Sequence, residues 1–281
     1  MASYRFGRFQ VEGVGDLIRT VAGATVLIGV GGPVLASVSR WVPRRQAYSA
    51  AALWARAARR FLALEEDISG LESVDPERRY VVLPLHEGLA DPLLLGHLPL
   101  RLRFVARDEL FHWPILGRYL RSSDQIEVRP EDRVGGLRRL LAEAERTFAR
   151  GESLVLFAQG TILGIESAFT SSAFRLADRL GVPLLPVVIT GTHRVWEHPF
   201  TDRLRYGCRV SMRVLPPLEP GSATVSRVEL ERRMKDLALS SETAPARRFE
   251  PSRDGWWDSY RYEIDPAFPD LARRVAEHRR G

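Results

Sequence analysis

Apolar positions along this chain fall into two alternating patterns. Short, nearly continuous apolar runs have the length of buried strands, and they occur at residues 80–85, 102–105, 153–157 and 183–189. Between them lie segments whose apolar residues follow helical spacing, at residues 49–66, 135–150 and 174–180. Residues 209–215 alternate as a more exposed strand does. Strands that alternate with helices predict an α/β fold with a mixed, largely parallel sheet flanked by helices.

The N-terminal region contains a long uncharged stretch. Residues 20–39 carry no charge and lie between Arg19 and Arg40, and about 20 apolar residues suffice to cross a bilayer. Pro33 interrupts the stretch, so a re-entrant or interfacial helical hairpin and a buried core helix are alternatives to a span. The arginines that follow favour a cytoplasmic position for the rest of the chain. We therefore expect an N-terminal hydrophobic membrane-associated helical segment at the cytoplasmic face of the cell membrane.

Composition is that of a globular protein with an arginine bias. The chain has 281 residues, of which 45% are hydrophobic and 27% charged. We divide it into a membrane-associated helical region at 1–70, a central domain at 71–220 and a helical extension at 221–281. Basic side chains outnumber acidic ones, 41 to 35, and nearly all are arginine. This bias suits a phosphate-bearing partner or an anionic membrane surface, and a GC-rich coding sequence would also produce it.

Few residues are available for a metal centre. Cys208 is the single cysteine, which excludes an intramolecular disulfide and a multi-cysteine metal site, and which fits a reducing compartment. The spacing of His193 and His198 is not a standard zinc signature, so both are interpreted as surface or core histidines. We expect no metal.

The strongest candidate for chemistry follows the first apolar run. That run delivers His86 to a turn, and Asp91 follows five positions later, with Gly88 between them. Asp91 and Pro92 have the pattern of a helix N-cap and a first helical residue. Catalytic groups gather beyond the carboxyl ends of strands in α/β sheets, so the pair is interpreted as a base with its orienting carboxylate. A buried histidine beside a capping aspartate, without chemistry, is the alternative.

Four short sequence motifs follow one another along the chain. They are HEGLAD at 86–91, RDEL at 107–110 with QIEVR at 125–129, FAQGTI at 157–162, and GVPLLPVVI at 181–189. With these blocks the chain resembles the glycerolipid acyltransferases, a family that includes bacterial 1-acylglycerol-3-phosphate acyltransferase. The resemblance covers about residues 75–215 and implies transfer of a fatty acyl group from acyl-CoA or acyl carrier protein to a hydroxyl of a lysophospholipid. It implies no cofactor and no nucleic acid partner.

The resemblance also implies roles for particular residues. His86 would act as general base and Asp91 would fix its tautomer, because a hydroxyl is a poor nucleophile until a base takes its proton. Arg107 and Arg129 are the candidates for binding the acceptor's phosphate. The remaining substrate-binding candidates, in the third block, are Gln159, Gly160 and Thr161. Backbone amides near Gly160 and Thr161 would stabilise the oxyanion.

Three positions depart from the family pattern. Gln159 stands where the family has glutamate, Ile162 where it has arginine, and Leu85 where asparagine is common. The first two departures leave alternatives open: an acyltransferase for an acceptor other than lysophosphatidate, or a catalytically weak relative that binds phospholipid. A lipid hydrolase is a further alternative, although the chain has no G-x-S-x-G motif.

Overall fold

The protein is built around one seven-stranded sheet. The structure, a computed structural model, describes residues 3–6, 9–129, 133–160, 164–195, 204–221, 226–243 and 263–278. Neighbouring strands follow the order β3-β9-β8-β4-β7-β5-β6. Every neighbouring pair is parallel except β8 with β9. This confirms the predicted mixed, largely parallel sheet. The strands are β3 (Glu65–Ser69), β4 (Val81–Pro84), β5 (Leu102–Arg107), β6 (Ile126–Val128), β7 (Ser153–Val155), β8 (Leu184–Thr190) and β9 (Arg209–Val214).

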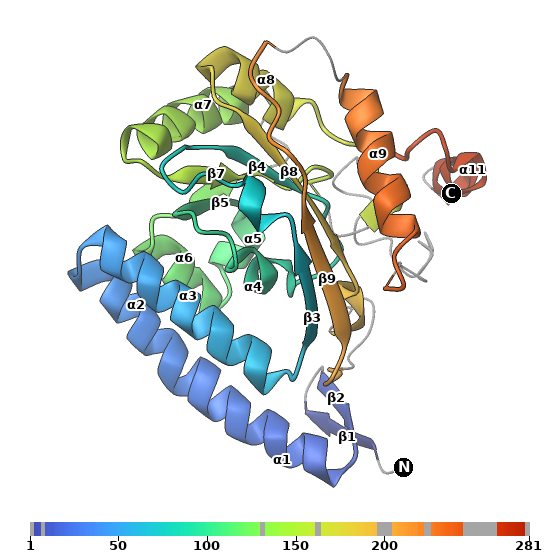
Figure 1. The fold of residues 1–281 in the computed structure, drawn as a ribbon. Helices are drawn as coiled ribbons and strands as arrows, with labels where there is room; N and C mark the ends of the chain where they lie inside the picture. Colours follow the sequence, from blue (N-terminus) through green and yellow to red (C-terminus); the bar gives the residue numbers. More distant parts are fainter. Residues whose placement is uncertain are drawn as a thin grey trace.

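Helices cover both faces of the sheet (Figure 1). One core lies between the sheet and the helices α7 (Arg133–Ala149), α8 (Ser172–Leu180) and α9 (Arg227–Leu239). The other face carries α3 (Arg44–Phe61) and α4 (Asp91–Leu95), with α5 (Asp108–Phe111) and α6 (Leu116–Ser122) nearby. Side chains of β4 alternate between the two cores, since Val81 and Leu83 enter the first and Val82 the second. All strand positions of β4 are buried, which explains its unbroken apolar run.

The N-terminal region forms a helical hairpin beside the sheet. After a two-stranded hairpin of β1 (Ser3–Phe6) and β2 (Phe9–Glu12), the chain runs through α1 (Val14–Gly23), a π-helix η1 (Ala24–Gly31) and α2 (Gly32–Trp41). The backbone stays right-handed helical at both junctions, Gly23 and Gly32. α3 then returns beside α2 and η1, and α2 also contacts α6 (Figure 1).

The structure corrects one alternative for residues 20–39. The chain does not reverse at Pro33; the reversal follows Trp41, at Pro43. Pro33 is the second residue of α2, and the π-helix before it changes the hydrogen-bond pattern where the proline lacks an N–H. Within the described ranges, none of the helices combines the length and the apolar character that crossing a bilayer requires.

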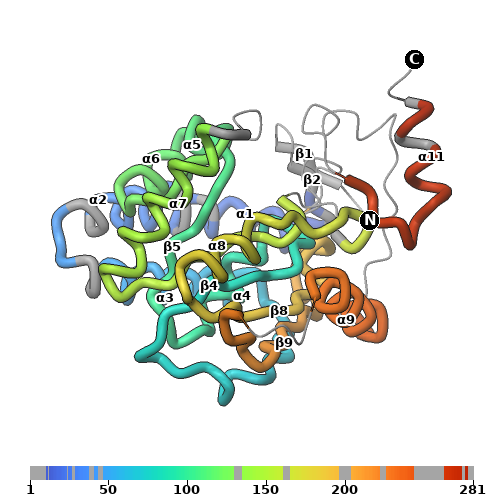
Figure 2. The backbone as a smooth tube through the Cα atoms, turned by 90° about the horizontal axis from the view of Figure 1, so that it is seen from above, coloured from blue at the N-terminus to red at the C-terminus, as the bar shows by residue number. Residues whose placement is uncertain are grey.

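Several elements differ from the pattern-based prediction. The helix expected at 49–66 begins earlier, after Pro43, and ends at Phe61, where Ala63 takes a left-handed conformation (φ 51°) and stops it. The residues that follow form β3, whose side chains are mostly exposed, so that no apolar run marked it. Gly181 ends α8 in the left-handed conformation (φ 62°), as its position predicts. Figure 2 shows α11 (Pro269–His278) at the periphery of the fold, beside the C-terminus.

Candidate functional site

His86 and Asp91 come together at the carboxyl edge of β4. His86 follows β4 by two residues, and its Nδ1 lies 2.6 Å from Asp91 Oδ2. The histidine side chain is 14% exposed, whereas Asp91 is fully buried. With the carboxylate accepting from Nδ1–H, the lone pair of the imidazole is on Nε2. The pair therefore has the geometry of a base held in one tautomer by a carboxylate.

Asp91 is oriented by the turn and not by the helix it begins. It is the first residue of α4, and Ala90 is the capping residue without a side-chain cap, so the N-cap prediction is wrong. Its Oδ2 also accepts from the backbone N–H groups of Glu87 (2.8 Å) and Gly88 (3.2 Å). Its Oδ1 accepts from the hydroxyl of Thr192. The carboxylate is thus fixed by four donors, two of them backbone amides of the tight turn and two of them the side chains of His86 and Thr192.

The segment after β7 supports His86 from a second side. Gln159 Oε1 accepts a hydrogen bond from the backbone N–H of His86 at 3.0 Å, and Gln159 is only 3% exposed. The Phe157 ring stacks on the imidazole with centroids 3.9 Å apart and planes inclined by 22°. β7 is the neighbour of β4, which brings these residues next to the turn. Gln159 therefore holds the backbone of the candidate base.

Of the two expected oxyanion donors in the third block, the structure describes Gly160. Gly160 has a left-handed conformation (φ 67°), and its N–H donates to the carbonyl oxygen of Phe157 at 3.1 Å. In this arrangement that N–H is used by a turn, so the structure does not support Gly160 as an oxyanion donor. Thr161 and Ile162 lie outside the described residues.

Arg107 and Arg129 lie at the same edge of the sheet as His86 but on other strands. Arg107 ends β5, is largely buried, and places Nε 3.9 Å from Glu109 Oε2. Arg129 follows β6 and is 60% exposed, with its Nε 3.5 Å from Asp108 Oδ2. Because neighbouring strands are about 4.8 Å apart, β5 lies ~10 Å and β6 ~14 Å from β4. The strands that carry the two arginines are therefore spaced along the sheet edge away from β4.

A second buried pair was missed from the sequence. Glu87 Oε2 accepts from the backbone N–H of Gly191 and lies 3.1 Å from His193 Nδ1. Burial is the main influence that raises the pKa of the Glu87 carboxyl above its usual range, while His193 acts in the opposite direction. The signal in the sequence was the polar T-G-T-H run after the strand at 183–189, since carboxyl ends of parallel strands meet at one edge. His193 is accordingly buried, whereas His198 lies outside the described residues.

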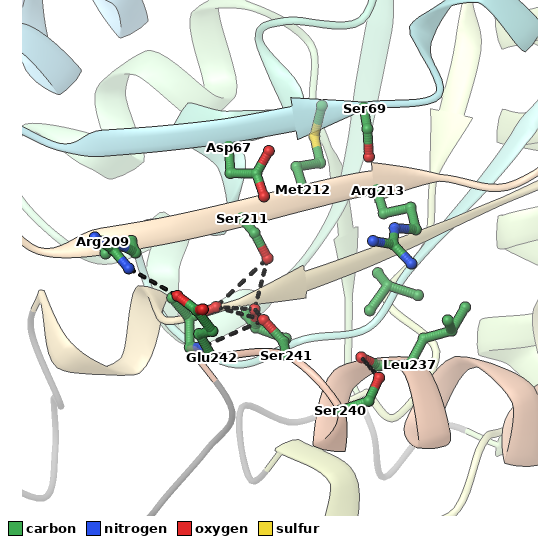
Figure 3. Close-up of a pocket in the computed structure, with 13 residues that line it drawn as sticks. Asp67, Ser69, Arg209, Ser211, Met212, Arg213, Leu237, Ser240, Ser241 and Glu242 are labelled. Atoms are coloured by element: carbon green, nitrogen blue, oxygen red, sulfur yellow. Dashed lines mark hydrogen bonds and ion pairs between the residues drawn. The ribbon is translucent and has the colours of Figure 1, made fainter.

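A cavity of about 240 Å³ lies between α9 and the strands β3, β8 and β9, apart from both buried pairs. His86 and Asp91 do not line it. Figure 3 shows hydroxyl groups gathered in it, and Thr190 Oγ1 lies 2.7 Å from Ser211 Oγ and 3.1 Å from Ser241 Oγ. Arg209 at its rim is paired with Glu242 at 2.8 Å. In the part of the chain that is described, no three His, Cys, Asp or Glu side chains are grouped to share a metal ion.

Comparison with known proteins supports the interpretation of the sequence blocks. Residues 66–190 match the family model described as acyltransferase. The 1-acyl-sn-glycerol-3-phosphate acyltransferase of Limnanthes alba is 24% identical over 166 residues, which cover 58% of this chain and 58% of that protein. The corresponding enzyme of Chlamydomonas reinhardtii is 28% identical over 155 residues, 53% of this chain and 46% of that protein. The matches thus span about half the length of these curated relatives.

The fold is also shared with a solved structure. The crystal structure of the 1-acyl-sn-glycerophosphate acyltransferase PlsC from Thermotoga maritima superimposes with a TM-score of 0.62. The match covers 80% of this chain and 93% of that chain, at 21% sequence identity. At this identity the likeness establishes the α/β fold.

Proposed function

From the acyltransferase-family domain at residues 66–190, we propose that this protein moves a fatty acyl group from acyl-CoA or acyl carrier protein to a hydroxyl of a lysophospholipid. The observation that carries the proposal is the 2.6 Å contact between His86 Nδ1 and Asp91 Oδ2 at the carboxyl edge of β4. Because Nδ1 is bound to Asp91, the lone pair on Nε2 is the one that can act as a base. In the described residues no hydrogen bond engages that nitrogen.

The proposed chemistry is direct attack on the thioester carbonyl. His86 Nε2 takes the proton of the acceptor hydroxyl while the oxygen–carbon bond forms. Asp91 stabilises the resulting imidazolium. The tetrahedral intermediate then collapses, the carbon–sulfur bond breaks, and the proton passes from the imidazolium to the thiolate. The products are an ester and a free thiol, and no acyl-enzyme is formed.

The lone cysteine is poorly suited to carry an acyl group. Burial raises the pKa of the Cys208 thiol above its ordinary value, so its thiolate is scarce at neutral pH. This favours His86 as a base acting on the acceptor over a mechanism through a cysteine nucleophile.

Arg107 and Arg129 are the proposed phosphate-binding residues. Both follow strands whose carboxyl ends lie at the His86 edge, so that an acceptor extended along this edge would place its hydroxyl at Nε2 and its phosphate at the arginines. Arg107 is on the nearer strand and is more buried, which makes it the principal candidate. A charge-assisted pair to phosphate at such a position contributes about 1.5 to 3 kcal/mol.

An assay of thiol release tests the proposal and separates its alternatives. Purified full-length protein is incubated with palmitoyl-CoA, with and without 1-acylglycerol-3-phosphate, and free thiol is measured. The proposal predicts release that depends on the acceptor. Release without acceptor would identify a thioester hydrolase. No release with 1-acylglycerol-3-phosphate or with any of a panel of other lysophospholipids, together with lipid binding, would identify a catalytically weak phospholipid-binding relative.

The departure at Ile162 predicts the acceptor preference. If the site is adapted to an acceptor other than lysophosphatidate, Ile162→Arg combined with Gln159→Glu should raise the preference for lysophosphatidate by ~10-fold or more, because it adds a cation for the phosphate. The measurement is kcat/KM for lysophosphatidate and for zwitterionic lysolipids. The control, Ile162→Gln combined with Gln159→Glu, keeps the change beside His86 and lacks the cation. A wild type that strongly prefers lysophosphatidate, and a preference that the double variant leaves unchanged, would remove the adapted-acceptor idea.

We further propose that the N-terminal helices hold the protein at the cytoplasmic face of the membrane. An exposed apolar row runs along α1, η1 and α2, with side chains 48 to 64% exposed. Trp41 at the end of α2 is 80% exposed, and on α3 the exposed Leu53 lies near the exposed Arg56 and Arg60. Apolar side chains beside arginines suit the boundary of an anionic bilayer. The row consists of Val14, Ile18, Val21, Val26, Val30 and Val34.

Charge introduced into this row should weaken membrane binding. We expect Val26→Glu combined with Val30→Glu to reduce binding to phosphatidylglycerol vesicles by ~10-fold or more, because burial of each valine contributes about 1.5 kcal/mol. Cosedimentation of the full chain with vesicles measures the change. The control is Val228→Glu, which changes an equally exposed valine on α9. Equal binding by wild type and the double variant would show that the row does not meet the membrane.

A further inference from the structure

We propose that Glu87 and His193 form a positioning pair that holds the His86–Asp91 turn in its working geometry. The inference rests on the proposed function, since it assigns these two residues a part in the same reaction. Both are buried, and they lie 106 positions apart in the sequence with Nδ1 and Oε2 separated by 3.1 Å. The side chains of Glu87 and His193 are only 1% and 8% exposed, so the pair would act through its neighbours.

The turn and the end of β8 are in direct contact. A Cβ added to Gly88 would lie 2.9 Å from the carbonyl carbon and oxygen of Thr192 and 3.0 Å from the backbone nitrogen of His193. Such distances leave no room for a side chain at Gly88. The backbone of the turn therefore lies against the backbone that follows β8.

Three consecutive residues after β8 form hydrogen bonds to two residues of the turn. Gly191 N–H and His193 bind Glu87, while the hydroxyl of Thr192 binds Asp91. Glu87 is thus the link that fixes the distance between the turn and this segment. Without it, one of the two side-chain links between the turn and this segment is lost, and the turn that carries His86 can shift relative to Thr192.

The segment after β8 is itself anchored on its far side. Thr190 joins the hydroxyl cluster with Ser211, Ser241 and Thr243 that lines the cavity in Figure 3. Gly191 has a left-handed backbone (φ 87°), and a Cβ there would lie 2.5 Å from the carbonyl oxygen of Arg209. Because the segment after β8 is bound on this far side, loss of the Glu87 side chain would let the turn that carries His86 move relative to it.

Charge at Glu87 is balanced by few groups. The titratable neighbours that influence it are His193, which favours the carboxylate, and Asp91, which opposes it. Its second oxygen, Oε1, is buried and accepts no hydrogen bond from the described residues. A glutamine keeps the acceptor oxygen that Gly191 and His193 use, whereas alanine removes it. The positioning role therefore predicts that Glu87→Gln substitutes for glutamate and that Glu87→Ala does not.

The test combines kinetics with a direct observation of His86. We expect Glu87→Ala to lower kcat ~10- to 100-fold with little change in KM for the thioester, as a small misplacement of a catalytic group does. Glu87→Gln should stay within ~3-fold of wild type. In protein labelled with ¹⁵N-histidine, the proton resonance of His86 Nδ1 should move in Glu87→Ala and keep its position in Glu87→Gln.

Two further variants keep the proposal falsifiable. His193→Ala removes one of the two donors to Glu87 and should give a smaller shift in the same direction. Glu152→Ala, which removes a buried carboxylate at the opposite end of β7, is the control for general destabilisation and should leave the resonance unmoved. An unmoved His86 resonance in both Glu87→Ala and His193→Ala would overturn the proposal. If wild type transfers no acyl group, the proposed function fails, and the resonance alone decides on the pair.

Discussion

Replacement of His86 by alanine is expected to lower kcat for acyl transfer by ~10²- to 10⁴-fold and to leave the fold intact. The imidazole is held by Asp91 on Nδ1 and stacked on Phe157, and it is the base that the proposed mechanism uses. Release of thiol from palmitoyl-CoA in the presence of acceptor measures the rate, and circular dichroism checks the fold. Near wild-type release by the purified variant would contradict the mechanism.

The chain offers a matched control for this change. His97 is also paired with a carboxylate, with Nε2 3.0 Å from Glu66 Oε2, but that carboxylate is on β3, which is three strands away from β4 in the order of the sheet. His97→Ala should keep the wild-type rate. Asp91→Asn should reduce kcat more than it weakens donor binding, because the amide no longer fixes the tautomer that leaves Nε2 free.

Replacement of Lys235 by methionine is expected to lower the free energy of unfolding by about 3 to 5 kcal/mol. This lysine, the only one in the chain, is buried on α9, where it donates to the carbonyl oxygen of Ser167 at 3.0 Å and to Glu231 at 2.7 Å. It also pairs with Asp265 in the C-terminal segment. Removing the ammonium leaves two largely buried carboxylates without their cation, which is the costly way to break a buried ion pair.

Urea unfolding followed by circular dichroism measures the change. The control is Arg146→Met, which removes an exposed partner of Glu143 on α7 and should cost no more than ~1 kcal/mol. An equal, small loss for both variants would show that the Lys235 network does not join the C-terminal segment to the core.

The sequence predicted the strands whose side chains are buried and missed those that are exposed or very short. β4 and β8 are buried at every position, so their apolar runs identified them directly. β3 has mostly exposed side chains and β6 is only three residues long, so neither produced a run that separates strand from helix or loop. The π-helix η1 packs against α3, and no local sequence pattern reports such a tertiary contact.

Part of the candidate site could be predicted from the sequence, and part could not. His86 and Asp91 lie within one turn, so their spacing alone predicted that they meet. Gln159 and the pair of Glu87 with His193 depend on β7 and β8 being the two neighbours of β4, and strand order cannot be read from the sequence. From the sequence alone, the glutamine at position 159 is therefore interpreted as a change in the acceptor-binding site. In the structure this side chain holds the backbone of His86.

The central claim is tested most directly by following the acyl group itself. Palmitoyl-CoA with a ¹³C-labelled chain is incubated with 1-acylglycerol-3-phosphate and a panel of other lysophospholipids, and the lipids are analysed by mass spectrometry for wild type and His86→Ala. The account predicts a ¹³C-labelled diacyl product from at least one acceptor with wild type, and none above background with the variant. Labelled free palmitate as the sole product, or equal amounts of diacyl product from both proteins, would contradict it.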